Sequence, residues 1–216
     1  MDFTARMVAL LGRLRRERNG VVTDSMCYYG APYGLNYGVS LPTVRAIARA
    51  ETPDHAFARY LFLQDVRELR LAALHIAQPA CVTPVEFASW ADGIVNSEVA
   101  EEAAFALLSR TACFPQWFDS WIVAPNYLLQ YAVLQAAARA DHRTMAWAQC
   151  AVDAVRGCAA DPMAARLVAQ GAVALLMALA AQNEQNRQAV SHIAGSLGKT
   201  PSEEYLHEEL AWRLEA

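Results

Sequence analysis

Residues 162–181 read PMAARLVAQGAVALLMALAA, and this stretch does most to decide the fold. Apolar side chains occupy nearly every position, so a helix here has no broad polar face and needs neighbours on two sides. Its most apolar part, Leu167 to Ala181, is 15 residues long and includes Gln170, whereas about 20 residues are needed to span a bilayer. The stretch therefore predicts a buried helix stacked between other helices.

Helical periodicity extends from this stretch along almost the whole chain. Apolar residues recur at three- and four-residue spacing, and no alternating run is bounded by hairpin turn signals. Prolines stand at or just before several expected helix starts, where the missing N–H has no partner within a helix anyway. We expect an all-α chain with helices near 3–18, 21–29, 40–51, 53–63, 65–77, 84–95, 97–109, 115–123, 125–140, 143–157, 162–181, 185–195 and 202–214.

The short connections between these helices predict how they are arranged. Helices joined by short loops lie side by side, and pairing each with the next gives units that begin near residues 65, 97, 125 and 162. These spacings lie near or below the roughly 40 residues of a HEAT repeat. We expect a HEAT-like repeat array of antiparallel helix pairs, an α-α superhelix, forming a single domain over 1–216. A compact irregular bundle is the structural alternative.

The composition is typical of a folded protein from a reducing compartment. Apolar residues make up 55% of the chain and charged residues 19%, which allows a sizeable core. The five cysteines are scattered and odd in number, and the N-terminal residues lack signal-peptide features, so the sequence predicts a cytoplasmic protein. Since no metal-ligand spacing and no nucleotide-binding glycine motif occurs, we expect no metal, no cofactor and no membrane partner.

Positive charge is concentrated at the N-terminal end of a chain whose net charge is −4. Residues 1–50 hold seven arginines and three acidic residues, whereas the rest of the chain holds 11 basic and 19 acidic residues. Phosphate neutralisation supplies most of the non-specific affinity for nucleic acids. The net charge of −4 argues against a nucleic-acid partner, and the distribution of charge places any basic face in the N-terminal part.

Two stretches in that part carry a resemblance to a known family. YGVSLPTVRAIA, residues 37–48, resembles the signature of AlkD-type DNA alkylation-repair proteins, which is Tyr or Phe, Gly, Val, two residues, Pro, two residues and Arg. DVRELRLAAL, residues 65–74, resembles the Glu-x-Arg-x-x-Ala helix of the same family. These proteins are HEAT-repeat alkylpurine DNA glycosylases. The resemblance, strongest over about 20–80, implies their fold and duplex DNA as a partner.

Five residues are candidates for DNA contacts. They are Arg45, Arg49, Tyr29, Tyr33 and Tyr37. The two arginines lie one turn apart near the start of a helix that Ser40 caps, where side chains and free N–H groups can bind phosphate. The tyrosines offer aromatic faces to a base or a cationic alkylated purine. In the structural alternative, Arg45 pairs with a neighbouring carboxylate such as Glu68, and the tyrosines pack a glycine-rich loop.

The resemblance also indicates where a catalytic carboxylate would lie. Hydrolysis of an N-glycosidic bond places positive charge on the sugar, which a carboxylate can stabilise. The corresponding stretch NSEVAEE has neither the family's tryptophan nor its aspartate, and its candidates are Glu101 and Glu98. In the alternative, these glutamates form the acidic first turn of a helix capped by Ser97. The family's later arginine and second tryptophan fall at Gln130 and within 171–174, which have neither.

Two functions follow from these observations. One is a DNA alkylation-repair protein that binds duplex DNA and releases alkylated purines by hydrolysis. The other is a non-catalytic HEAT-repeat module that binds DNA or a protein partner and has lost the family's catalytic residues.

Overall fold

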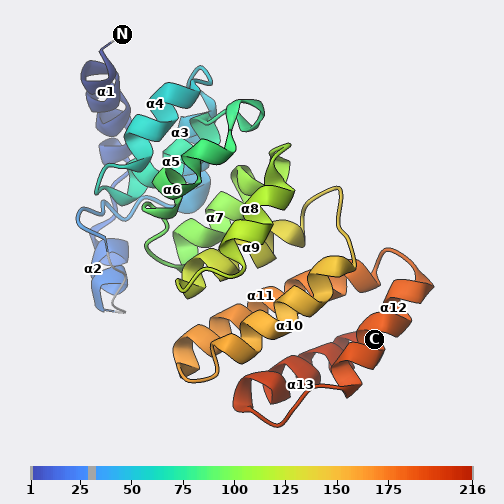
Figure 1. Cartoon of the computed structure of the whole chain (residues 1–216). Coiled ribbons are helices and arrows are strands. Elements are labelled where there is room, and N and C mark those ends of the chain that lie inside the picture. The colour runs from blue at the N-terminus through green and yellow to red at the C-terminus, as the bar shows by residue number, and fades with distance from the viewer. Residues whose placement is uncertain (1, 29–32, 216) are drawn as a thin grey trace. The chain divides into compact units, whose positions relative to one another are not determined.

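The structure, a computed structural model, describes residues 2–28 and 33–215, and the regular elements in these ranges are helices joined by loops (Figure 1). Within these residues, the one β-type interaction is a single parallel bridge between Leu35 and Val66. The all-α class is therefore confirmed. By its contacts the chain divides into two compact units, Met1–Cys113 and Phe114–Ala216.

The helices follow the expected ranges closely. The first unit contains α1 (Phe3–Arg16), α2 (Gly20–Tyr28), α3 (Leu41–Arg49), α4 (His55–Phe62), α5 (Arg67–Ile76), η1 (Pro79–Cys81), η2 (Pro84–Glu86), α6 (Phe87–Ala91), α7 (Ser97–Ala106) and η3 (Leu108–Arg110). The second contains α8 (Phe114–Trp121), α9 (Tyr127–Ala137), α10 (Ala146–Gly157), α11 (Pro162–Ala180), α12 (Glu184–Gly195) and α13 (Pro201–Glu215).

Polar side chains fix several helix starts. The Ser40 hydroxyl accepts the Thr43 N–H at 3.3 Å, with Pro42 in the first turn of α3, as the sequence predicts. At α7 the cap is Asn96, whose side chain accepts the Val99 N–H at 3.0 Å. The expected cap, Ser97, is instead the first residue of the helix, because the extended backbone ends at Asn96.

One expected helix, 84–95, is much shorter in the structure. It consists of η2 followed by the five-residue α6, which ends at Ala91. The chain turns at Gly93, where a Cβ atom would lie 2.0 Å from a ring carbon of Phe62. The helical pattern of the sequence does not reveal this close approach of Phe62.

In the first unit, α5 is the central helix. It packs against α3, α4 and α7, and all of its residues except His75 are buried. The buried set includes the charged residues Arg67, Glu68 and Arg70. Buried charges must be paired or hydrogen-bonded, so α5 organises polar contacts as well as apolar packing.

In the second unit, α11 is the central helix and packs against α9, α10, α12 and α13. Its 19 residues are long and apolar enough to cross a membrane by length and composition, yet 61% of its most apolar window is buried inside the fold. Burial on several sides is typical of a core helix, as the sequence predicts.

The helix pairs differ from expectation, because α9 packs against α8 and α11 rather than pairing with α10.

Candidate nucleic-acid interface

The loop before α3 is fixed by backbone hydrogen bonds to its neighbours. The Asn19 N–H donates to the Tyr37 carbonyl at 2.9 Å, and the Arg67 N–H donates to the Leu35 carbonyl at 2.8 Å. Gly38 has φ +68°, and a Cβ atom there would lie 2.1 Å from the Asn19 carbonyl oxygen. Both the left-handed backbone and the close approach require glycine.

Glu68 links the two stretches that carry the family resemblance. Its carboxylate is fully buried and accepts the backbone N–H groups of Tyr37 and Val39, each at 3.2 Å. The Arg67 guanidinium donates to the same carboxylate at 3.0 Å. Glu68 therefore holds the backbone of the loop, and it is not the ion-pair partner of Arg45.

Arg67 connects this loop to Glu98 of α7. The guanidinium, 2% exposed, donates to the Val39 carbonyl at 2.8 Å and to both oxygens of Glu98 at 2.9 and 2.5 Å. Burial alone would lower the pKa of Arg67, but the hydrogen bonds and charge of Glu98 raise it. The Tyr33 hydroxyl donates to Glu98 at 2.5 Å, and burial together with the Glu98 carboxylate raises the pKa of Tyr33. Both candidates, Glu98 and Tyr33, thus take part in a structural cluster.

Arg45 forms a second ion pair with α7. It donates two hydrogen bonds to Glu102, at 2.8 and 2.5 Å, and His75 Nε2 is hydrogen-bonded to the same carboxylate. Burial would raise the pKa of Glu102, but the hydrogen bonds from Arg45 and His75 lower it to about 2. Arg45 therefore has a carboxylate partner, as the structural alternative predicts, although the partner is Glu102.

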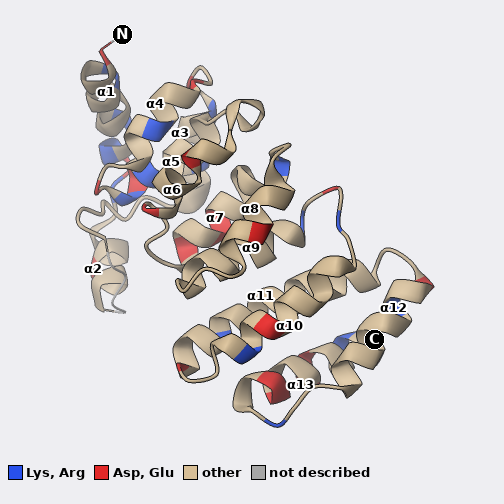
Figure 2. Ribbon diagram, viewed as in Figure 1, with Lys and Arg blue, Asp and Glu red and all other residues tan. Residues whose placement is uncertain are grey.

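The exposed positions of α7 are Glu101 and Phe105, one turn apart (Figure 2 shows the acidic residues of α7 in red). Phe105 is 44% exposed and is one of ten large hydrophobic residues that are exposed within the described residues. The Arg45 guanidinium carbon lies 4.9 Å from the centre of the Phe105 ring. The ion pair with Glu102 thus also places a cation against this ring.

A cavity of about 150 Å³ opens beside Phe105. Its charged and polar lining consists of Arg49, Arg110 and His75, and its apolar lining of Leu74, Ala77, Pro79, Phe105 and Ala106. Within 2–28 and 33–215, neither Arg49 nor Arg110 has a carboxylate within ion-pair distance. The cavity therefore carries uncompensated positive charge next to an open aromatic ring.

The other N-terminal arginines are partly neutralised. Arg6 and Arg13 both pair with Glu51, and Arg6 also binds Asp54 at 2.7 Å. Arg15 lies over the half-buried Tyr37 ring, 5.5 Å from its centre. The candidate Tyr29 lies outside the described residues. Arg15, Arg16 and Arg18 are exposed at the end of α1 and have no carboxylate within ion-pair distance among the described residues, so part of the expected basic surface remains there.

Comparison with known proteins adds information on the fold. No protein-family model matches the chain, and no curated protein matches it. A solved structure from a new family of proteins related to the HEAT-like repeat DNA glycosylases, with affinity for branched DNA structures, aligns with a TM-score of 0.71. The alignment covers 99% of this chain and 95% of that one, at 17% sequence identity. The chain has the HEAT-like repeat fold.

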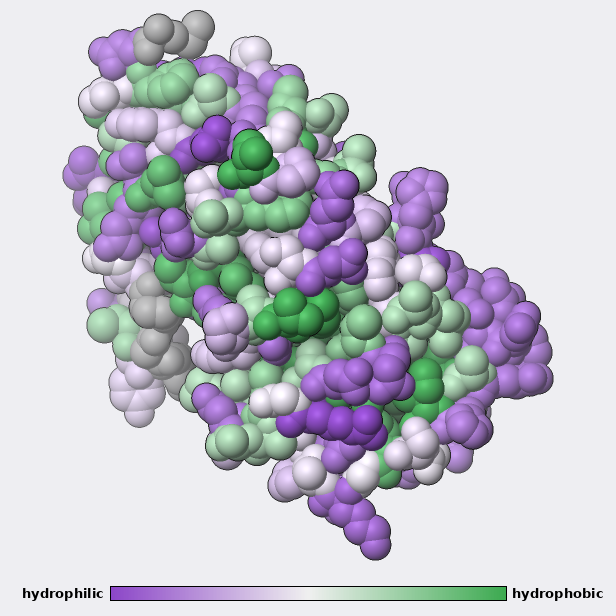
Figure 3. Space-filling view, in the orientation of Figure 1, coloured by the Kyte–Doolittle hydropathy of each residue, from purple (hydrophilic) through white to green (hydrophobic). Residues whose placement is uncertain are grey.

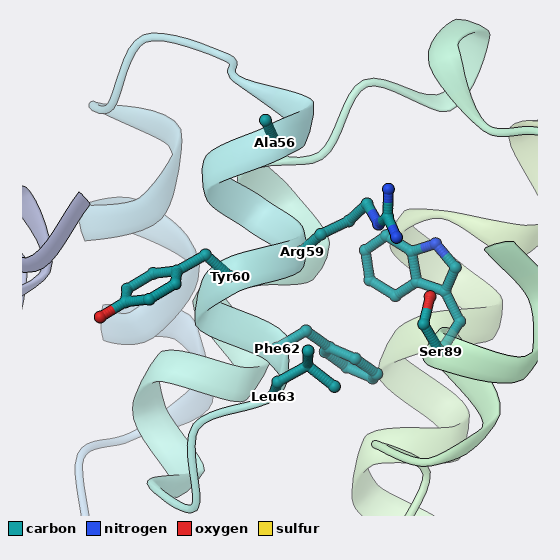
Figure 4. Close-up of a pocket in the computed structure, with 7 residues that line it drawn as sticks. Ala56, Arg59, Tyr60, Phe62, Leu63 and Ser89 are labelled. Atoms are coloured by element: carbon teal, nitrogen blue, oxygen red, sulfur yellow. The ribbon is translucent and has the colours of Figure 1, made fainter. Parts of the chain in front are cut away.

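A second cleft of this HEAT-like protein, about 170 Å³, lies between α4 and α6 and has a different character (Figure 4). Its arginine, Arg59, is paired with Glu86 at 2.8 Å, and the remaining lining is largely apolar and aromatic. Large hydrophobic side chains form small separate groups on the face seen in Figure 3. The Arg49–Arg110 cavity is thus the better candidate for a nucleic-acid site.

Sequence reasoning missed Phe105 and Arg110. A phenylalanine in an alanine-rich helix is most often a core residue, and a single arginine after the helix carries no motif. One signal was available, because Phe105 follows Glu101 by four residues and so shares its face of the helix. An exposed face at Glu101 therefore implies an exposed Phe105.

Proposed function

We propose that this HEAT-like protein binds DNA through the surface formed by α3, α7 and η3, and prefers branched DNA to continuous duplex. The observation that carries the proposal is the cavity in which Arg49 and Arg110 lack carboxylate partners, beside the exposed Phe105. Guanidinium groups bind phosphate oxygens with paired hydrogen bonds. The free cysteines agree with a cytoplasmic, reducing setting.

The net negative charge of the chain favours DNA binding through a few arginines rather than through a broad positively charged surface. The chain has a net charge of −4, so the attraction for DNA must come from arginines that no carboxylate neutralises. A branch point interrupts the continuous helix, and an exposed ring can stack on a base that the branch leaves unpaired, whereas a continuous duplex keeps its bases within the stack. The affinity for branched DNA described for the structural neighbour supports this preference.

The proposal is tested by fluorescence anisotropy with a four-way junction and a linear duplex of matched sequence, over a range of salt concentrations. We expect tighter binding of the junction and a linear fall of log affinity with log salt. Arg49→Ala and Arg110→Ala should each reduce the salt slope by about one unit. The matched control is Arg139→Ala, which removes an exposed arginine whose hydrogen bonds stay with Gln135 of its own helix turn.

Absence of binding to both DNAs at low salt would overturn the proposal and favour a protein partner. Equal loss of affinity in Arg139→Ala and Arg49→Ala would show that binding depends on overall charge rather than on this cavity.

Glycosylase activity is a second candidate, favoured by one observation. Glu101 is an exposed carboxylate one turn from an exposed aromatic ring, the combination that could stabilise a positively charged sugar near a bound base. The test is release of alkylated purines from methylated duplex DNA. Release that Glu101→Gln abolishes, without a change in the circular dichroism spectrum, supports catalysis, and no release at protein excess contradicts it.

A further inference from the structure

Phe105 and the cavity beside it suggest recognition of one particular DNA feature. The ring is 44% exposed on a helix whose other residues are buried or half-buried, apart from Glu101. Leaving so large an apolar surface in water has no packing benefit, whereas a base stacked on it removes that surface from water. The exposed ring therefore fits a flat, aromatic ligand.

A positively charged side chain lies over the ring. Arg45 is held by two hydrogen bonds to the buried Glu102, and its guanidinium lies 4.9 Å from the ring centre. Because Glu102 is itself bound to His75, the support behind the ring is anchored in the core. The contact with the held guanidinium favours one ring position, and a side chain that is already ordered pays a smaller entropy cost when a base stacks on it.

The cavity next to the ring fits the charged part of the same ligand. Its volume of about 150 Å³ equals roughly five water molecules at about 30 Å³ each, which is enough for a phosphate group. Arg49 belongs to α3 and Arg110 to η3, so two arginines from different elements line one small space. The ring thus fits a base and the neighbouring cavity fits a phosphate, and the two groups occur together in a single nucleotide.

We propose that this surface holds one unpaired nucleotide of a DNA strand, with its base stacked on Phe105 and its phosphate bound by Arg49 and Arg110. The inference rests on the proposed DNA-binding function and adds the feature that the protein recognises. A fully paired duplex keeps its bases within the stack and offers phosphates alone. A bulged or flap nucleotide offers both groups.

The test compares three duplexes of the same sequence: fully paired, with one bulged nucleotide, and with one bulged abasic site. The bulged duplex carries 2-aminopurine at the unpaired position, so that stacking is seen as fluorescence quenching. We expect the unmodified protein to bind the bulged duplex roughly 5- to 100-fold more tightly than the paired one. The abasic bulge should bind like the paired duplex.

Phe105→Ala should abolish the preference for the bulged duplex and the fluorescence quenching, and Phe105→Trp should restore both. Thermal melts of each variant show whether the fold is intact. We expect an intact fold, because Phe105 is partly exposed and contributes little to the core. Equal affinity of the unmodified protein for paired and bulged duplex would overturn this inference alone. Binding of no DNA at all would overturn the proposed function and the inference together.

Discussion

Glu102 is the residue that connects the core of the first unit to the candidate interface. Its carboxylate is 2% exposed and accepts hydrogen bonds from Arg45 and His75. A buried carboxylate that lost these donors would be strongly destabilising. The residue therefore couples the stability of the first unit to the position of Arg45 and, through it, of Phe105.

The acid stability of the protein tests this role. Because the pKa of Glu102 is about 2 in the folded state against 4.5 ordinarily, its ionised form stabilises the fold above about pH 4.5, and this contribution is lost as the pH falls towards 2. We expect Glu102→Gln to lower the free energy of unfolding by about 3 kcal/mol at pH 7. Urea denaturation at several pH values measures the difference between the two proteins.

The difference between the two proteins should shrink as the pH falls towards 2, because the carboxyl group of the unmodified protein becomes protonated over this range. A difference of the same size at pH 7 and pH 2 would contradict an electrostatic role for Glu102.

At the scale of single residues, sequence reasoning predicted part of the candidate site. It predicted Ser40 as a cap and a carboxylate partner for Arg45, and the structure has both. It could not identify Glu102 as that partner, because three glutamates lie close together in the sequence and only the packing of α7 decides which one is buried. The DNA-binding and catalytic roles of the candidates stay predictions.

At the scale of elements, the loop before α3 requires glycine at one position, whereas the helix α1 contains a glycine that it does not require. Gly38 has a left-handed backbone and no room for a Cβ atom, whereas a Cβ atom at Gly12, inside α1, would meet nothing within 4 Å. We expect Gly38→Ala to lower the free energy of unfolding by at least about 2 kcal/mol. Gly12→Ala should raise it by about 0.5–1 kcal/mol.

Urea denaturation of both variants beside the unmodified protein provides the measurement. If Gly38→Ala were as stable as Gly12→Ala, the loop geometry that positions α3 would be wrong.

Helix positions were more predictable than helix partners. Periodicity and proline placement gave starts within a few residues for most helices, because both act locally. Pairing was harder, since α9 is followed by a longer connection to α10 than the one that joins it to α8. The contacts of α9 with α11 depend on packing between residues far apart in the sequence.

At the scale of the whole molecule, the sequence predicts one domain, and the contacts show two compact units. We propose that the units unfold together. Leu71→Ala in α5 and Leu176→Ala in α11 each remove a fully buried side chain and should cost about 2–5 kcal/mol. In a cooperative domain, both substitutions lower the midpoint of the same single transition.

Two measurements distinguish joint unfolding of the units from separate unfolding. They are calorimetry, and denaturation followed by both circular dichroism and tryptophan fluorescence. Two separate transitions, with each substitution affecting only one, would contradict the single-domain prediction.

The central position of α11 also affects how the protein is made. Two of its neighbours, α9 and α10, precede it on the chain, but α12 and α13 follow it. While the ribosome is still synthesising these last helices, a 19-residue apolar segment lacks part of its covering. A nascent chain in this state exposes the kind of surface that chaperones bind and that promotes aggregation. The order of synthesis thus leaves the most hydrophobic helix only partly covered until α12 and α13 emerge.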